Sequence, residues 1–371
     1  MALVEYDLFG QKRDKVQTAI DRLRAFEPQE GYFLAFSGGK DSQCIYHLAK
    51  MAGVKFDAHY QVTSVDPPEL VQFIKAQYPD VHRDIPHDKD GKPVTMWSLI
   101  AQHTIPPTRK MRYCCAKLKE VAGKERIVVT GVRWAESARR KNLHGIVNIK
   151  TEDKKFIGRA LDVKGASLNI RGGLVMNDDN DEARRMVEHC FRTKKTMVNP
   201  IVDWTDDDVW EFLIEVAKVS HCKLYDPPYS KKRLGCIGCP MAGRKGMLAD
   251  FEQYPKYKAA YIKTFDEMIE NHLGNDIDIL GKRIPVDKLS GSQVFDWWIW
   301  WSGRNPTSAN LPESLRCLWG GKNNRWDASG TRSLRVHAPM ASVHIVGTRA
   351  GWTNTRRCAS SRESDTKCRN W

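Results

Sequence analysis

A strand–turn–helix unit near the N-terminus most constrains how this chain can fold. Tyr32 to Phe36 is a short apolar run suited to a buried strand, and apolar residues recur at helical spacing from Cys44 to Ala49. Between them lies a polar turn of six residues: Ser37, Gly38, Gly39, Lys40, Asp41 and Ser42. Two glycines permit a tight turn, and the free amides of a helix N-terminus attract anions. The unit predicts an anion-binding turn; the alternative is an ordinary junction rich in turn formers.

Further strands and helices alternate after this unit. Apolar runs predict strands at 32–36, 56–63, 80–85 and 126–131, and periodic segments predict helices at 11–27, 41–52, 67–77, 94–103 and 115–124. Such alternation indicates an α/β protein with a doubly wound, mostly parallel sheet and helices on both faces. A ligand would bind outside the carboxyl ends of the strands, where Ser37 and Gly131 stand.

The chain is long enough for more than one domain. We expect an N-terminal helix within 1–28, an α/β domain over 29–245 with an insertion at about 141–198, a helical extension over 246–311, and a basic, poorly ordered tail over 312–371. Within the insertion the sequence predicts a helix over 181–192. Thr205 is expected to cap the helix that follows it, and the aromatic stretch 294–301 to pack in a core rather than to stack on bases.

Composition narrows the class of protein. No apolar run approaches the roughly 20 residues that a membrane helix needs, and the N-terminus lacks the pattern of a secretory signal. We therefore expect a cytoplasmic protein without a membrane partner, whose ten cysteines are reduced or bound to metal. The net charge of +14 favours polyanionic partners such as nucleic acid, or anionic nucleotides; simple solubility is the alternative.

Four cysteines form two pairs with metal-ligand character. Cys114 and Cys115 are adjacent, and Cys236 and Cys239 form a CxxC between glycine and proline. Four thiolates suffice for zinc or for a [4Fe–4S] cluster, although adjacent cysteines are unusual in structural zinc sites. The alternative is that the first pair is buried and the second is a redox pair.

Several segments, in order, resemble the phosphoadenosine phosphosulfate reductase family within the PP-loop ATP pyrophosphatase superfamily. The matching segments are SGGKDS at 37–42, TSVDPPELVQFI at 63–74, CCAKLKE at 114–120, GVRWAESARR at 131–140 and NPIVDWTDDDVWEFL at 199–213. They extend over about 30–240. The resemblance implies the adenine nucleotide alpha-hydrolase-like fold, with ATP or a sulfonucleotide and Mg²⁺ as ligands. It also favours a [4Fe–4S] cluster over zinc at the four cysteines.

The resemblance assigns roles to individual residues. The implied nucleotide-binding residues are Ser37, Gly38, Gly39, Lys40, Asp41, Ser42, Asp66, Gly131 and Ser137. Lys40, Asp41, Arg133 and Arg140 are the implied catalytic residues, with the two arginines as clamps on a phosphate or on the acceptor. The implied metal ligands are Cys114, Cys115, Cys236 and Cys239.

Two departures separate this chain from typical sulfonucleotide reductases. Its loop is intact, whereas those enzymes usually carry an altered one, and it has no Glu-Cys-Gly-Leu-His segment near its C-terminus. The departures favour the sister branch, which includes the sulfur-transfer proteins of DNA phosphorothioation, with a sulfur-donor protein as a further partner. We therefore expect an ATP-dependent, pyrophosphate-releasing adenylation linked to sulfur transfer. A sulfonucleotide reductase and a non-catalytic, nucleic-acid-binding accessory subunit are the alternatives.

Overall fold

The computed structural model describes residues 3–6, 10, 12–123, 125–150, 154–177, 196–274, 276–279, 282–285 and 288–303. The expected helix over 181–192 and the tail over 312–371 lie outside these residues, as do Cys190, Cys317, Cys358 and Cys368. Among the described helices, none combines the length and the apolar character required to cross a bilayer.

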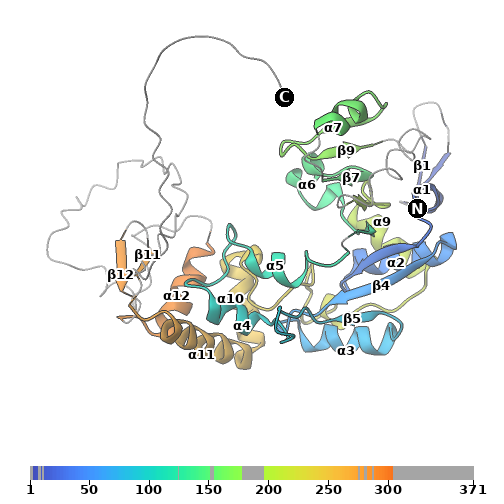
Figure 1. The fold of residues 1–371 in the computed structure, drawn as a ribbon. Coiled ribbons are helices and arrows are strands. Elements are labelled where there is room, and N and C mark those ends of the chain that lie inside the picture. The colour runs from blue at the N-terminus through green and yellow to red at the C-terminus, as the bar shows by residue number, and fades with distance from the viewer. Residues whose placement is uncertain are drawn as a thin grey trace, which may run out of the picture.

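One large sheet organises the chain (Figure 1). In spatial order its strands are β5 (His82–Asp84), β4 (Phe56–Gln61), β3 (Tyr32–Phe36), β6 (Ile127–Val129), β10 (Thr196–Val198), β7 (Val147–Ile149), β9 (Leu174–Met176) and β8 (Ala166–Leu168). The first five pair in parallel, and the last three are antiparallel to their neighbours. The predicted mostly parallel α/β fold is confirmed.

The order of the parallel strands creates a switch point. The first strand of this sheet along the chain, β3, lies between β4 on one side and β6 on the other. The chain therefore continues to one side of β3 and returns on its other side, and in open α/β sheets the ligand-binding crevice lies at such a point, here outside the carboxyl ends of β3 and β6. The turn that begins at Ser37 follows β3, and Gly131 follows β6. Both predicted site segments thus stand at the position where open α/β sheets bind ligands.

The remaining elements are helices, single turns and two hairpins. The helices are α1 (Lys15–Ala25), α2 (Lys40–Ala52), α3 (Pro68–Gln77), α4 (Met96–Gln102), α5 (Tyr113–Leu118), α6 (Ala138–Leu143), α7 (Lys154–Leu161), α9 (Asp206–Glu211), α10 (Gly243–Gln253), α11 (Pro255–Asn271) and α12 (Gly291–Trp301). Short turns are η1 (Trp134–Glu136), the π-helical η2 (Phe212–Val216), η3 (Lys223–Tyr225) and η4 (Pro240–Ala242). The hairpins are β1 (Val4–Tyr6) with β2 (Lys12–Asp14), and β11 (Asp276–Ile279) with β12 (Lys282–Pro285).

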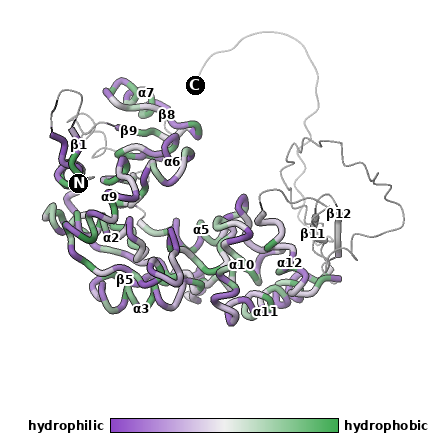
Figure 2. Tube along the Cα trace, turned by 180° about the vertical axis from the view of Figure 1, so that it is seen from behind, coloured by the Kyte–Doolittle hydropathy of each residue, from purple (hydrophilic) through white to green (hydrophobic). Residues whose placement is uncertain are grey.

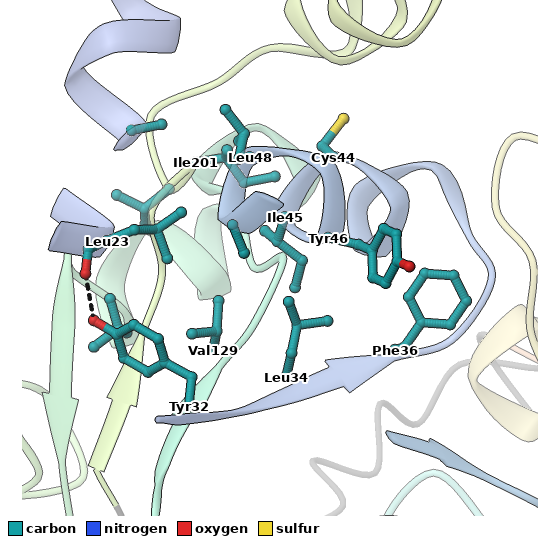
Figure 3. Close-up of a cluster of buried hydrophobic side chains, with 14 of the residues drawn as sticks. Leu23, Tyr32, Leu34, Phe36, Cys44, Ile45, Tyr46, Leu48, Val129 and Ile201 are labelled. Carbon is teal, nitrogen blue, oxygen red and sulfur yellow. Dashed lines mark hydrogen bonds between the residues drawn. The ribbon is translucent and has the colours of Figure 1, made fainter. Parts of the chain in front are cut away.

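A first core lies between the sheet and the helices that cover it. Figure 3 shows Ile45 and Leu48 of α2 above Leu34 of β3, all of them fully buried. The Tyr32 hydroxyl donates a hydrogen bond of 2.7 Å to the Leu23 carbonyl, which joins α1 to the same core. This packing fixes the start of α2, and with it the turn after β3.

A second core holds the helical C-terminal part, where α12 packs against α10 and α11. Trp298 is fully buried, and its Nε1 donates to the Pro107 carbonyl at 2.6 Å. The aromatic stretch is therefore core, as predicted. Helices α4 and α5, which precede β6 in the chain, join this core rather than the first one. In Figure 2 hydrophilic and hydrophobic residues alternate along these helices, as expected for helices with one buried face.

Element boundaries differ from the sequence expectations for identifiable reasons. Helix α1 starts at Lys15 rather than residue 11, because the Asp14 side chain accepts from the Val16 and Gln17 amides. The helical extension expected over 246–311 is interrupted before Pro255, which has no amide hydrogen to donate, so that α10 ends at Gln253 and α11 begins at Pro255. Helix α5 spans Tyr113–Leu118 instead of 115–124, so both cysteines of the first pair lie in its first turn. Thr205 caps α9 as predicted, accepting from the Asp208 amide.

Candidate functional site

The turn after β3 is a compact cradle at the N-terminus of α2. Gly38 has a φ of +71°, in the region that favours glycine, and Gly39 is the N-cap of the helix. The Ser42 hydroxyl donates to the Gly39 carbonyl at 2.8 Å and accepts from the Ser37 amide at 3.2 Å. The turn is therefore held by its own serines, and the first amides of α2 face the crevice without carbonyl partners in the helix.

Packing against α3 also requires glycine at position 38. A Cβ on Gly38 would lie 2.7 Å from Ile74 Cδ1 and 2.8 Å from Leu70 Cδ1, both on α3. Gly38→Ala should therefore lower the free energy of unfolding by about 2–4 kcal/mol, from backbone strain and overpacking together. Gly53→Ala is the matched control, because its φ is +70° but its Cβ would meet open space, and strain alone should cost about 1 kcal/mol. Urea titration of both variants measures the difference; equal losses would contradict the packing explanation.

Two cations and two carboxylates meet beside the turn. Lys40 Nζ lies 3.0 Å from Asp206 Oδ1 and 3.7 Å from Asp41 Oδ1. Arg133 donates from Nε to Asp41 Oδ1 at 2.7 Å and from a terminal nitrogen to Asp206 Oδ1 at 2.6 Å. A third Arg133 bond reaches the Trp204 carbonyl at 3.2 Å. The quartet joins α2, the segment after β6 and the start of α9.

Burial and charge divide the roles within this quartet. The Arg133 side chain is 1% exposed and the Lys40 side chain 6%, whereas Asp206 is 69% exposed. Burial lowers the pKa of Arg133, but Asp41 and Asp206 more than offset this and the net pKa is raised. The guanidinium of Arg133 is thus committed to protein acceptors and orients Asp41. Asp206, being exposed, is the member that can rotate into solvent.

The other residues that the resemblance implies at the nucleotide differ in how closely they approach the turn and α2. Gly131 packs directly on α2, since a Cβ there would lie 2.9 Å from the Asp41 carbonyl carbon. Ser137 is an exposed N-cap whose hydroxyl accepts from the Arg140 amide at 3.2 Å. Arg140 and Arg233 both face Glu136 Oε2, at 3.1 and 3.2 Å. Burial, with Arg233 and Arg133 nearby, lowers the pKa of Arg140. These arginines form the rim of the crevice.

The two cysteine pairs come together at the same edge of the sheet. Cys236 Sγ lies 3.6 Å from Thr63 Oγ1 and 3.9 Å from Asp66 Oδ1, in the segment that follows β4. Cys114 and Cys236 both pack against the second core. The hydrogen bond to Cys115 and burial raise the pKa of Cys114, and Cys236 and Cys239 add to this effect. Burial raises the pKa of Cys239, and Cys115 adds to it, so all four thiols are electrostatic neighbours.

The environment of the pairs favours one thiolate. Cys114 hydrogen-bonds to Cys115, which lowers the pKa of Cys115; Arg112 and Lys119 add to the effect. Burial raises the pKa of Cys236, so that thiol stays protonated at neutral pH. Within the described residues no three His, Cys, Asp or Glu side chains stand in a geometry that holds a metal ion. Four thiols are the donors that zinc or an iron–sulfur cluster prefers. In this structure they do not stand in a ligating geometry, so metal binding would require the two pairs to move closer together.

Asp66 lies with the cysteines rather than with the turn. Its Oδ2 accepts from the Tyr60 hydroxyl at 2.6 Å and from the Thr63 amide at 3.0 Å, and its Oδ1 faces Cys236. The carboxylate is buried, so it fixes the loop on which the CxxC rests. The Ile237 amide donates to the Val65 carbonyl at 2.8 Å and continues this attachment.

Sequence reasoning missed several residues of the site. Tyr225, whose hydroxyl accepts from the Lys40 amide at 2.9 Å, carries no motif that marks it. Asp206, in an acidic run at the start of a helix, resembles an ordinary helix-capping residue in the sequence, yet it binds both Lys40 and Arg133. His221 packs edge-on against Tyr225 and Trp210 and pairs with Asp226 at 2.9 Å, and the neighbouring Cys222 is buried.

No curated protein matches the chain. Among solved structures, the FMN adenylyltransferase of Candida glabrata, in complex with FAD and inorganic pyrophosphate, is 13% identical with a TM-score of 0.34. The match covers 60% of this chain and 62% of that one, less than two thirds of its length. The family described as the phosphoadenosine phosphosulfate reductase domain matches residues 31–242, more than half of the 371 residues, and the chain belongs to this family.

Proposed function

We propose that this protein binds ATP at the switch point and transfers its adenylyl group to an acceptor, with release of pyrophosphate. The observation that carries the proposal is the intact SGGKDS turn at the crevice between β3 and β6. In the step, an acceptor oxygen attacks the α-phosphorus and forms a new P–O bond. The bond to the bridging oxygen breaks, and the electron pair leaves with pyrophosphate.

The turn supplies what this step requires. The first amides of α2 and the Lys40 ammonium would stabilise charge on the phosphates as it builds. Lys40 is held by Asp206, and because Asp206 is largely exposed, its rotation into solvent would release Lys40 to a phosphate oxygen. Asp41 would remain oriented by Arg133 and could hold Mg²⁺, which supplies charge neutralisation for the leaving group when bound.

The rim of the crevice favours an anionic acceptor. Arg139 and Lys141 are exposed on α6, and Lys232 and Arg233 are exposed in the loop that meets Glu136. Four exposed cations on these two segments would attract a polyanion such as nucleic acid. We infer a sulfur-transfer role from the four thiols at the adjacent edge, where a [4Fe–4S] cluster bound by Cys114, Cys115, Cys236 and Cys239 is the proposed group and a sulfur-donor protein the proposed partner.

A nucleotide panel with a variant of the turn tests the proposal. Wild-type protein should release pyrophosphate from labelled ATP and should not form sulfite from either adenylyl sulfate or phosphoadenylyl sulfate. Lys40→Ala should weaken ATP binding by about 1.5–3 kcal/mol, because a charge-assisted phosphate contact is lost. Lys50→Ala is the control, since Lys50 lies at the far end of the same helix with its side chain 52% exposed.

The outcomes separate the candidate functions. Sulfite formation would identify a sulfonucleotide reductase. Nucleotide binding without pyrophosphate release, together with nucleic-acid binding, would identify an accessory subunit. Unchanged ATP affinity in folded Lys40→Ala protein would remove the turn from the phosphate site.

A further inference from the structure

The Tyr225 hydroxyl lies directly at the N-terminus of α2. It accepts a hydrogen bond of 2.9 Å from the Lys40 amide, the first amide of the helix. A Cβ built on Gly39 would lie 3.3 Å from the Tyr225 hydroxyl and 3.5 Å from Ser37 Oγ. Two hydroxyls from segments far apart in sequence therefore border the position that a Cβ on Gly39 would occupy, beside the first amide of α2.

Tyr225 is held in this position from two sides. Its ring meets Trp210 of α9 edge-on, with ring centroids 5.0 Å apart and planes at 88°. The buried Gln43 of α2 donates to the Ser220 carbonyl at 2.9 Å, which ties the segment before η3 to the helix. Leu224, the residue before Tyr225, is fully buried. The hydroxyl is thus fixed relative to α2 by packing as well as by its own hydrogen bond.

The hydroxyl has an unused proton. Its oxygen accepts from Lys40, and among the described residues no acceptor receives the Tyr225 hydrogen. Burial raises the pKa of Tyr225 well above its ordinary value, so the phenol stays protonated at neutral pH. A neutral hydroxyl that accepts from a helix amide can still donate to an anion placed beside that amide.

We propose that Tyr225 is a phosphate-binding residue: its hydroxyl donates to a phosphate oxygen of the nucleotide held by the turn, and extends the anion site beyond the helix amides. The inference rests on the proposed function, since it needs a phosphate at the turn. It goes beyond that function by adding a donor from outside the SGGKDS segment. The chemistry recognised is a pyrophosphate group rather than the nucleoside.

Tyr225→Phe is the test, because it keeps the ring contacts with Trp210 and removes only the hydroxyl. The probes are magnesium pyrophosphate, ATP and adenosine, measured by calorimetry on the full chain. Pyrophosphate and ATP should bind roughly tenfold to a hundredfold more weakly, as expected for loss of a hydrogen bond to a charged group, while adenosine binding should not change. Tyr229→Phe is the matched control, from the same loop and 37% exposed.

Each other outcome overturns the inference in a recognisable way. Tighter binding of pyrophosphate by Tyr225→Phe would mean that the hydroxyl competes with the anion for the Lys40 amide. Unchanged affinities with a lowered melting temperature would reduce Tyr225 to a helix cap. If wild-type protein binds neither pyrophosphate nor ATP, the proposed function fails as well, whereas equal binding by both proteins overturns only the role of Tyr225.

Discussion

Arg133→Ala should lower the free energy of unfolding by about 3–5 kcal/mol and abolish nucleotide binding. The Arg133 side chain is 1% exposed and bonds to Asp41, to Asp206 and to the Trp204 carbonyl. Its removal leaves the Asp41 carboxylate, with 22% of its side chain exposed, without its shortest charged partner and opens a cavity between α2 and α9. Asp41 lies in the first turn of α2, so the loss would reach the phosphate site directly.

Denaturant titration and ATP binding measure the two effects separately. Arg159→Ala is the matched control, because Arg159 is an exposed arginine on α7 that belongs neither to the quartet nor to the four exposed cations; its stability and affinity should stay near those of the wild type. Arg133→Lys keeps the charge but not the three-way geometry, so it should fold and still bind ATP weakly. Full stability of Arg133→Ala would mean that Arg133 does not hold the quartet together.

The pH dependence of stability provides a second readout of the quartet. Burial raises the pKa of Asp206, but hydrogen bonds from Lys40 and Arg133 outweigh burial and hold the pKa below its ordinary value. A group with a depressed folded pKa contributes stability above its unfolded pKa of about 3.9, and loses it as the pH falls through the folded value. The stability gap between wild type and Arg133→Ala should therefore narrow below about pH 4.

Local signals explain how much of the fold could be predicted. The strand from Tyr32 to Phe36, the glycine turn and the helix after it depend on neighbouring residues, and the structure reproduces them. Capping by Thr205 was equally local. Where a single side chain decides a boundary, as Asp14 does for α1, periodicity alone extended the helix too far. The antiparallel part of the sheet depends on strands of three residues each, too short to leave a periodic signal.

Only the residues of the candidate site that lie within recognisable sequence motifs could be predicted. Tyr225 reaches Lys40 across 185 residues, and Asp206 reaches Arg133 across 73. Such contacts depend on the strand order, which brings α9 and η3 to the crevice, and no spacing in the sequence encodes it. The same applies to Asp66, whose place beside Cys236 follows from the pairing of β4 with β3.

One segment connects the two halves of the site. From Tyr225, at the N-terminus of α2, the chain passes Arg233, which meets Glu136, and reaches Cys236 beside Thr63. Lys231 binds Asp250 of α10 at 2.6 Å, so the segment is also attached to the second core. One piece of chain therefore connects the turn proposed to hold the nucleotide with the CxxC, which is the arrangement that the proposed adenylation linked to sulfur chemistry would need.

Anaerobically purified protein should contain about four iron and four sulfide per chain and absorb broadly in the visible blue, if the four cysteines hold the proposed cluster. Cys236→Ser should lose nearly all of this iron, because its thiol belongs to the CxxC and is one of the four proposed ligands. Cys222→Ala is the matched control: it removes a buried cysteine that lies by His221 rather than among the two pairs, and it should retain the iron.

The metal content distinguishes the readings of the four thiols, because each predicts a different composition. One zinc per chain in colourless protein would mean a structural thiolate site, since zinc also accepts four sulfur ligands. Colourless protein without metal would overturn ligation altogether; the low pKa of Cys115, at about 5, would then make it the first thiol to react with iodoacetamide.

Equal iron loss in Cys236→Ser and Cys222→Ala would point to general unfolding, so circular dichroism of both variants must accompany the iron measurement. Only iron lost from folded Cys236→Ser and kept in Cys222→Ala supports a cluster at the two pairs.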